Sequence, residues 1–309
     1  MKNNKINNNK ERRGNNGGGR GRRVRGERAG RRDRTREKYS IKISKAITTV
    51  QTHKLEGIYI LNSDIKYLAT KNLTPGEKVY EEELINFEEG IIGGNDENDS
   101  QSNSEININN KNKVEYRIWN IYFSKLGASL ENGMTNIYIK PGSKVIYLGA
   151  GSDNYSTISH VSDIIGKNGI IYRVEKSEIK GLDLKIFAKK RDNIIPIIND
   201  SKKPYDYKNL ISSLVDCIII DISDSEIVNI ISINSQFFLS NKWGFICIIN
   251  TNKEKSNILS QTEIIDVKIK LLRAYNLYVR EFITLEPFAN GYATISGIYK
   301  PFREILDEE

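Results

Sequence analysis

Short apolar runs alternate with longer amphipathic segments over most of the chain from residue 114 onward. The short runs are rich in Ile and Val and end at polar or Gly residues, a pattern typical of buried strands. The longer segments repeat apolar residues at a spacing of three or four, as helices that pack on a sheet do. The pattern predicts strands over residues 145–148, 170–175, 194–198, 217–221, 244–249, 278–285 and 292–299. It predicts helices over residues 124–133, 157–166, 181–191, 205–214, 225–238 and 258–275.

The order of these elements indicates the fold class. Strands that alternate with helices form a parallel, Rossmann-like α/β sheet. Only a turn separates the last two strands, so they should form a hairpin that makes one strand antiparallel. Seven strands with such a final hairpin predict the sheet of a class I methyltransferase. A dehydrogenase-type Rossmann fold is the alternative, but the turn Ala150-Gly151-Ser152-Asp153 lacks its G-x-G-x-x-G motif.

Residues 39–87 show a different pattern, with shorter runs that follow one another closely. Strands are predicted over residues 41–43, 57–61, 67–69 and 78–80. The turn sequences Asn62-Ser63-Asp64 and Thr74-Pro75-Gly76-Glu77 separate them and favour hairpins. Residues 88–112 are polar and rich in Asn, which predicts a flexible loop. The sequence therefore predicts a small antiparallel β domain over 39–112 and a larger α/β domain over 113–309.

The positive charge of the chain lies in its first 38 residues. Of the 47 Lys and Arg residues, 15 lie in residues 1–38, and the same segment has only 4 of the 39 Asp and Glu residues. The segment is rich in Gly and Arg and nearly free of apolar side chains, so it is predicted to be a disordered tail. Its arginines would bind RNA phosphates with little sequence preference. A solubilising tail and a nuclear import signal are alternatives that remain compatible with this role.

The two cysteines, Cys217 and Cys247, lie inside apolar strand-like runs. They are predicted to be buried, reduced thiols of an intracellular protein. No Cys and His spacing is typical of zinc, so no metal is expected. No apolar run reaches the roughly 18–20 residues of a membrane span, and residues 1–38 lack the apolar core of a secretory signal. We therefore expect a soluble protein without a membrane partner.

A candidate ligand site follows the first strand of the α/β domain. Gly149, Ala150 and Gly151 let the backbone approach a ligand closely, because small residues remove Cβ clashes. Glu175 ends the next strand, where a carboxylate can accept both ribose hydroxyls of a nucleoside cofactor. A simple tight turn is the alternative interpretation of the glycines.

A series of motifs occurs in order between about His53 and Phe302. The motifs are Thr70-Lys71-Asn72-Leu73-Thr74-Pro75-Gly76-Glu77, Glu115-Tyr116-Arg117-Ile118-Trp119-Asn120, Ser124-Lys125-Leu126, Ile139-Lys140-Pro141-Gly142, Ser159-His160-Val161-Ser162-Asp163, Ala188-Lys189-Lys190-Arg191, Asn193-Ile194-Ile195-Pro196 and Leu285-Glu286-Pro287. Together they resemble the fibrillarin family, the RNA 2′-O-methyltransferases of the nucleolus. The resemblance implies an rRNA methyltransferase that uses S-adenosyl-L-methionine and acts in pre-rRNA processing. It also implies a box C/D guide RNA, a Nop-domain scaffold protein, a kink-turn-binding protein and a location in the nucleolus of the nucleus.

The resemblance places the cofactor-binding residues. They fall on Ser156, Thr157, Glu175, Lys176, Asp200, Ser201, Asp221, Ile222, Ser223 and Asp224. Within this set Glu175 would hold the ribose and Asp200 would lie near the adenine. Lys176 stands where the family has an aromatic residue, and the turn over 149–157 is two residues longer than the family's. Both departures predict weaker cofactor binding, since an adenine ring stacks well on an aromatic face.

The resemblance also places a catalytic constellation of two lysines, an aspartate and a histidine. The first lysine falls on Lys125 and the aspartate on Asp221. The second lysine position is occupied by Asn250 and the histidine position by Tyr292. An amide cannot act as a base, and a phenol is a poor base at neutral pH. Alternatives are a solvated lysine on a helix for Lys125 and a helix-capping role for Asp221.

Few other residues could take the place of the missing lysine and histidine. Lys253 or Lys255 could reach the vacant lysine position, although each lies along a predicted loop. The two histidines, His53 and His160, are predicted to be structural. The leading hypothesis is therefore a guide-RNA-directed rRNA 2′-O-methyltransferase. A catalytically weakened or inactive structural subunit of the same particle is the alternative, and methylation of a protein side chain is a third possibility without specific support.

Overall fold

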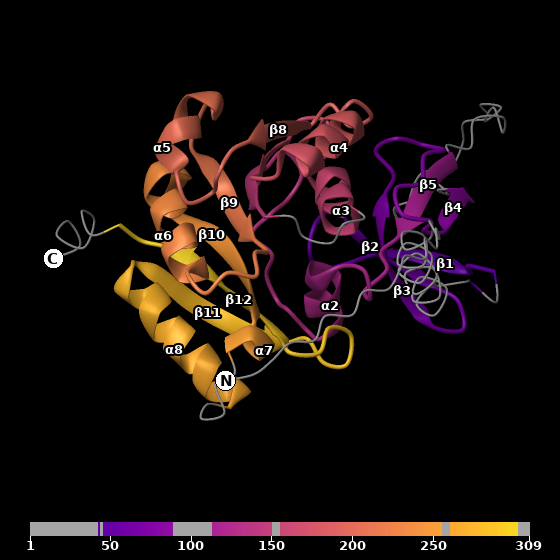
Figure 1. Cartoon of the computed structure of the whole chain (residues 1–309). Helices are drawn as coiled ribbons and strands as arrows, with labels where there is room; N and C mark the ends of the chain where they lie inside the picture. Colours follow the sequence, from indigo (N-terminus) through magenta and orange to yellow (C-terminus); the bar gives the residue numbers. More distant parts are fainter. Residues whose placement is uncertain (1–42, 44–45, 89–112, 150–154, 255–259, 302–309) are drawn as a thin grey trace, which may run out of the picture. The chain divides into compact units, whose positions relative to one another are not determined.

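The computed structural model describes residue 43 and residues 46–88, 113–149, 155–254 and 260–301. The predictions for the tail over 1–38, for the loop over 89–112 and for residues 150–154 lie outside these ranges. The first described part is an antiparallel sheet of five strands in the order β1-β2-β3-β5-β4 (Figure 1). Its strands are β1 (Thr49–Thr52), β2 (Ile58–Asn62), β3 (Lys66–Lys71), β4 (Leu84–Glu88) and β5 (Lys113–Ile118).

The small sheet confirms two of the predicted strands and shows that one was wrong. Residues 57–61 and 67–69 correspond to β2 and β3, but residues 78–80 are not in a strand. Of the strand predicted over 41–43, only residue 43 lies within the described residues. The Glu82 carboxylate accepts hydrogen bonds from the backbone N–H groups of Val79 and Tyr80, at 2.8–3.1 Å. These donors are therefore not available to a strand ladder. Strand β5 completes the sheet by pairing with β3 and β4, although it follows the domain boundary predicted after residue 112.

The larger sheet has seven strands in the order β11-β12-β10-β9-β6-β7-β8 (Figure 1). The parallel strands are β6 (Lys144–Leu148), β7 (Ile170–Glu175), β8 (Ile194–Ile198), β9 (Val215–Ile220) and β10 (Leu239–Asn250). Strands β11 (Leu277–Thr284) and β12 (Tyr292–Tyr299) form the predicted hairpin, and β12 pairs antiparallel with β10. The predicted methyltransferase topology is thereby confirmed.

Helices cover both faces of the larger sheet. Helices α5 (Pro204–Tyr207), α6 (Ile227–Phe238) and α8 (Gln261–Ala274) lie on one face, and α2 (Lys125–Glu131), α3 (Ser156–Ile165) and α4 (Glu178–Ala188) lie on the other (Figure 1). A short helix, α7 (Thr251–Glu254), follows β10. The predicted helix over 205–214 was too long. It ends after a 3-10 turn over Lys208–Leu210, because Ile211 becomes extended and buries its side chain in the core.

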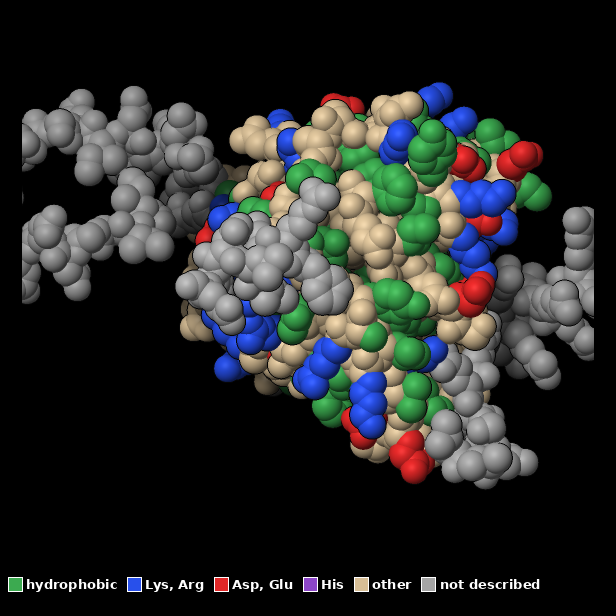
Figure 2. Space-filling view, turned by 90° about the vertical axis from the view of Figure 1, so that its left-hand side faces the viewer, with side chains coloured by type: hydrophobic (Ala, Val, Ile, Leu, Met, Phe, Trp, Pro, Cys, Tyr) green, Lys and Arg blue, Asp and Glu red, His purple; other side chains and the backbone are tan. Residues whose placement is uncertain are grey.

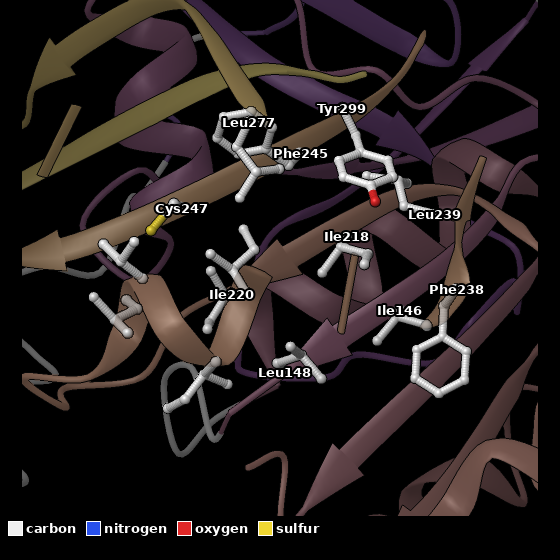
Figure 3. Close-up of a cluster of buried hydrophobic side chains, with 14 of the residues drawn as sticks. Ile146, Leu148, Ile218, Ile220, Phe238, Leu239, Phe245, Cys247, Leu277 and Tyr299 are labelled. Atoms are coloured by element: carbon white, nitrogen blue, oxygen red, sulfur yellow. The ribbon is translucent and has the colours of Figure 1, made fainter. Parts of the chain in front are cut away.

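The core has one layer on each face of the sheet, because side chains alternate along every strand. On β9, Ile218 and Ile220 join the cluster beneath α6, whereas Cys217 joins the cluster beneath α3. Figure 3 shows the first cluster, with Cys247 and Phe245 of β10 beside these isoleucines. Both cysteines are buried and free of disulfides, as predicted.

A buried network of charges joins the small sheet to helix α3. The Asp163 carboxylate of α3 accepts from Arg117 Nη1 of β5 at 2.7 Å and from Arg191 Nη1 at 2.6 Å. Thr70 Oγ1 of β3 donates to the same carboxylate at 2.7 Å. Arg117 also pairs with the buried Glu82 at 2.6 Å. This network fixes the small sheet to helix α3.

The surface shown in Figure 2 carries interspersed charges of both signs, with hydrophobic side chains between them. Among the described residues, no helix combines the length and the apolar character needed to cross a membrane. The same residues contain no cluster of three or more His, Cys, Asp or Glu side chains suited to a metal ion.

Candidate active site

A cavity of about 410 Å³ opens at the carboxyl ends of the parallel strands. Ligands of open α/β sheets bind at this edge, because the loops that follow the strands diverge there. The cavity is lined by Lys125, Gly149, Val174, Glu175, Lys176, Asp200, Ser201, Lys202, Asp221, Ile222, Ser223, Asp224, Ile230 and Tyr292. Eight of the ten residues predicted to bind the cofactor are in this lining, and Ser156 and Thr157 are not.

The end of β6 requires a glycine. Gly149 has φ of 101°, in the left-handed region that favours glycine. A Cβ atom at this position would lie 2.4 Å from Ile222 Cγ1 and 2.6 Å from the carbonyl oxygen of Asp221. The residue therefore lets the segment after β9 pack closely beside the end of β6. This close approach forms one wall of the cavity.

Glu175 lies at the end of β7 and is 6% exposed. Its Oε1 accepts from the backbone N–H of Ser177 at 2.9 Å, and its Oε2 lies 3.4 Å from Arg173 Nη2. Ser177 in turn caps the N-terminus of α4 by accepting from the Lys180 N–H. Local contacts thus orient the carboxylate at the edge of the cavity, where it can accept hydroxyl groups of a ligand.

Lys176 and Asp200 form an ion pair of 2.8 Å at the mouth of the cavity. The hydrogen bond from Lys176 holds the pKa of Asp200 below its usual value, and a backbone N–H from Lys202 acts in the same direction. Lys176 is therefore a partner of the carboxylate that was predicted to lie near the adenine. Sequence reasoning identified both positions but not their pairing, since nothing local in the sequence links them.

Lys202 is a lining residue that sequence reasoning missed. Its ammonium pairs with Asp224 at 3.0 Å and also contacts Glu226. The pKa of Asp224 is lowered by the backbone N–H of Glu226 and by Lys202. This basic side chain balances part of the acidic charge that Asp200 and Asp224 place around the cavity. Its position directly after Ser201 was the available signal in the sequence.

Ser156 and Thr157 begin helix α3 and are both buried. Thr157 Oγ1 lies 2.9 Å from Ser124 Oγ, the group that caps helix α2. Tyr155 precedes them with φ of 57°, and its ring stacks on Phe187 of α4 at 4.5 Å. In the described residues these side chains therefore connect α3 to α2 and α4.

The Lys125 ammonium donates to Asp221 Oδ1 at 2.6 Å. The Asp221 side chain is only 4% exposed, and that of Lys125 is 23% exposed. Lys125 is the first residue of α2, while Asp221 directly follows β9. Lys125 is thus not simply a solvated lysine. Asp221 is not the N-cap of α6, which is Glu226. The pair places an ammonium and a carboxylate together at the rim of the cavity.

Asn250 and Tyr292 are direct neighbours across the β10–β12 ladder. Asn250 Nδ2 donates to Tyr292 Oη at 2.9 Å. The Lys125 ammonium lies 4.5 Å from the centre of the Tyr292 ring. All four positions of the predicted constellation are therefore close together. The side chains of Lys253 and Lys255 lie outside the described residues.

Both histidines have structural contacts away from the cavity. His160 Nδ1 lies 2.8 Å from Thr70 Oγ1, and its Nε2 lies 2.6 Å from Tyr80 Oη. Its ring stacks on Trp119 at 4.8 Å. Burial, together with the nearby Arg117, holds the pKa of His160 well below 6.5, so the ring is neutral. His53 Nδ1 accepts from the Leu55 backbone N–H in a local turn.

The mixed seven-stranded sheet and the cavity at its carboxyl edge define a class I methyltransferase fold. A model of the fibrillarin family matches residues 50–301. The chain belongs to the fibrillarin family.

Three similar proteins document this membership. The chain is 38% identical over 252 residues to the rRNA 2′-O-methyltransferase fibrillarin of Rattus norvegicus, covering 82% of this chain and 70% of that protein. It is 39% identical over 253 residues to the rRNA 2′-O-methyltransferase fibrillarin of Encephalitozoon cuniculi, with coverages of 81% and 78%. The crystal structure of Aeropyrum pernix fibrillarin with natively bound S-adenosyl-L-methionine has a TM-score of 0.67 and 30% identity, and the match covers 82% of this chain and 100% of that one.

Proposed function

We propose that this protein is an S-adenosyl-L-methionine-dependent rRNA 2′-O-methyltransferase that acts in pre-rRNA processing. The observation that carries the proposal is the Lys125–Asp221 ion pair at the rim of the cavity, in a chain of the fibrillarin family. An ammonium beside a buried carboxylate is suited to a reaction in which a neutral hydroxyl develops negative charge.

The lining fits the cofactor. The close approach at Gly149 leaves a wall without a Cβ, and the Glu175 carboxylate is held at the end of β7, where it would accept the ribose hydroxyls. Asp200 and Ser201 would border the adenine, and Ile222, Ser223 and Asp224 would follow the opposite side, with Lys176 beside Asp200. Ser156 and Thr157 would support this site from the first turn of α3. The bound cofactor would supply an electrophilic methyl group on a sulfonium.

Lys125 and Asp221 would act on the target nucleotide. The reaction would form a C–O bond between the ribose 2′-oxygen and the methyl carbon as the S–C bond breaks, and the hydroxyl proton would leave to solvent. The Lys125 ammonium would stabilise the negative charge that develops on that oxygen. Asp221 would hold the ammonium in place, since a lysine stem otherwise has many conformations. Tyr292 lines the cavity and accepts a hydrogen bond from Asn250, but neither side chain carries an ionic charge.

The family also suggests the assembly in which the reaction occurs. We propose a box C/D guide RNA that pairs with pre-rRNA, held by a Nop-domain scaffold protein and a kink-turn-binding protein, in the nucleolus. Residues 39–309 contain 32 Lys and Arg against 35 Asp and Glu, and this near-neutral balance supports a division of labour in which guide RNA and partner proteins position the substrate. The basic segment over 1–38 would add affinity for RNA phosphates.

Two measurements test the proposal. Calorimetric titration of S-adenosyl-L-methionine into the purified chain should show binding at one site. In a particle reconstituted with guide RNA and scaffold proteins, Lys125→Met should lower the single-turnover rate at least about 100-fold, the usual range for a group that stabilises a transition state.

The matched control is Lys144→Met. Lys144 bonds Ser213 Oγ at the amino end of β6, away from the cavity, and its replacement should leave the rate unchanged. Absence of cofactor binding in the parent chain would instead favour the purely structural subunit.

A further inference from the structure

The two residues that depart from the family's constellation contact each other. Asn250 ends β10 and Tyr292 begins β12, in direct cross-strand register. The amide of Asn250 donates to the phenol oxygen at 2.9 Å. A second hydrogen bond, from the Asn252 backbone N–H to Asn250 Oδ1 at 3.1 Å, orients the amide so that its N–H₂ group faces the phenol. The tyrosine is thus tethered at its far end.

The tether holds the Tyr292 ring against Lys125. The ammonium lies 4.5 Å from the ring centre, within the range of a cation–π interaction. The same ammonium contacts Asp221 at 2.6 Å. Lys125 is therefore held from two sides, by a buried carboxylate and by an aromatic face.

The position of this ammonium matters because lysine has a flexible four-carbon stem. Small displacements of a group that acts on the reacting atoms lower the rate strongly. The ion pair with Asp221 alone leaves the ammonium free to move around the carboxylate. The contact with the Tyr292 ring restricts that movement. A tethered ring gives more restriction than a free one, since a side chain that is fixed at two points loses rotational freedom.

We propose that Asn250 and Tyr292 form one positioning unit that holds the Lys125 ammonium on Asp221 for methyl transfer. The proposal rests on the function proposed above. The unit acts through Lys125. Its two members are coupled, so that each loses its effect when the other is removed.

The first test is a double-mutant cycle in the reconstituted particle. Tyr292→Phe keeps the ring and removes the phenol oxygen, while Asn250→Ala removes the donor. Each should lower the single-turnover rate about threefold to tenfold, and the double variant should be no slower than the slower single variant. Tyr292→Leu removes the ring and should cause a larger loss than Tyr292→Phe. The cofactor dissociation constant should change by less than about twofold in every variant, since the effect is on the reacting groups.

Tyr299→Phe is the matched control, because Tyr299 lies at the opposite end of β12 and borders the core beneath α6. Its rate should equal that of the parent. Losses that multiply in the Asn250→Ala and Tyr292→Phe double variant would show that the two residues act independently. An unchanged rate in Tyr292→Leu would show that the ring does not position Lys125.

The second test does not depend on activity. In the chain labelled with ¹³C-lysine, the ε-CH₂ protons of Lys125 should show an upfield ring-current shift, assigned by its loss in Lys125→Arg. The shift should disappear in Tyr292→Leu and decrease in Asn250→Ala. A normal lysine shift in the parent would overturn the positioning proposal. A clear ring-current shift in a chain that cannot methylate RNA would refute the proposed function while supporting the positioning unit.

Discussion

Replacing Asp163 with Asn should strongly destabilise the protein. The Asp163 carboxylate accepts from Arg117 and Arg191 at 2.7 and 2.6 Å, from Thr70 Oγ1 at 2.7 Å and from the Leu73 backbone N–H at 3.1 Å. The side chains of the three charged residues are at most 1% exposed. Asp163→Asn keeps the volume but removes one negative charge, so two buried guanidinium groups lose their shared partner.

The two arginines differ in the carboxylate partners that they keep after the substitution. Burial by itself lowers the pKa of Arg117, but Asp163 and Glu82 together raise it above its ordinary value. The pKa of Arg191 is lowered by burial, an effect that Asp163 partly offsets. After the substitution Arg117 retains Glu82, whereas Arg191 loses its carboxylate. Leaving a buried charge unpaired costs about 3–5 kcal/mol of unfolding free energy.

Urea denaturation followed by circular dichroism measures this loss, and thermal melting should fall by about 10 °C, since each kcal/mol corresponds to about 2–4 °C in a domain of this size. The control is Lys190→Met, which breaks an ion pair with Glu77 whose side chains are 60% and 49% exposed. Exposed pairs contribute less than about 1 kcal/mol. A loss below about 1 kcal/mol in Asp163→Asn would refute the argument that the buried network holds the small sheet to α3.

Four further predictions concern the tail, the cofactor site, the rim and the buried histidine. Deleting residues 1–38 should remove most sequence-independent RNA affinity, measured by filter binding at several salt concentrations, and change the melting temperature by only a few degrees. Glu175→Ala should weaken S-adenosyl-L-methionine binding in calorimetry by about 1.5–3 kcal/mol, the contribution of a charged hydrogen-bond partner, and unchanged affinity would place the ribose elsewhere. The double restoration Asn250→Lys with Tyr292→His should raise the single-turnover rate at least about tenfold, because two groups that act on the transition state typically contribute about 10²- to 10⁴-fold each, more than the positioning contact that the change removes, and no gain would show that these positions were assigned wrongly. His160 is neutral in the fold because its pKa is lowered, whereas in the unfolded chain the same ring binds a proton below about pH 6.5. Protonation therefore favours the unfolded chain, and stability is lost as the pH falls below 6.5. Unfolding free energy should therefore fall through this residue as the pH drops below about 6, and His160→Gln should show a flatter dependence in urea titrations at pH 5 and 7.

Much of the larger sheet was predictable from the sequence because its signals are local. Runs such as 217–220 are apolar on both faces, as a central parallel strand requires, and turn residues separate them from amphipathic helices. The short connection between the last two strands predicted their hairpin, and the family motifs identified the positions that line the cavity. Each of these properties depends on residues that are close together in the chain.

Only the tertiary structure decided which of those positions contact one another. Asn250 and Tyr292 become hydrogen-bond partners through strand register, and Lys125 at the start of α2 contacts Asp221, which directly follows β9. In the small sheet, β5 completes the sheet from beyond the predicted boundary, and Glu82 takes the backbone donors of residues 79 and 80. The physical reason is common to all these cases. A contact between residues far apart in the chain forms only when the residues between them fold and bring the two together. The hydrophobic pattern of one segment does not indicate which other segment it will contact.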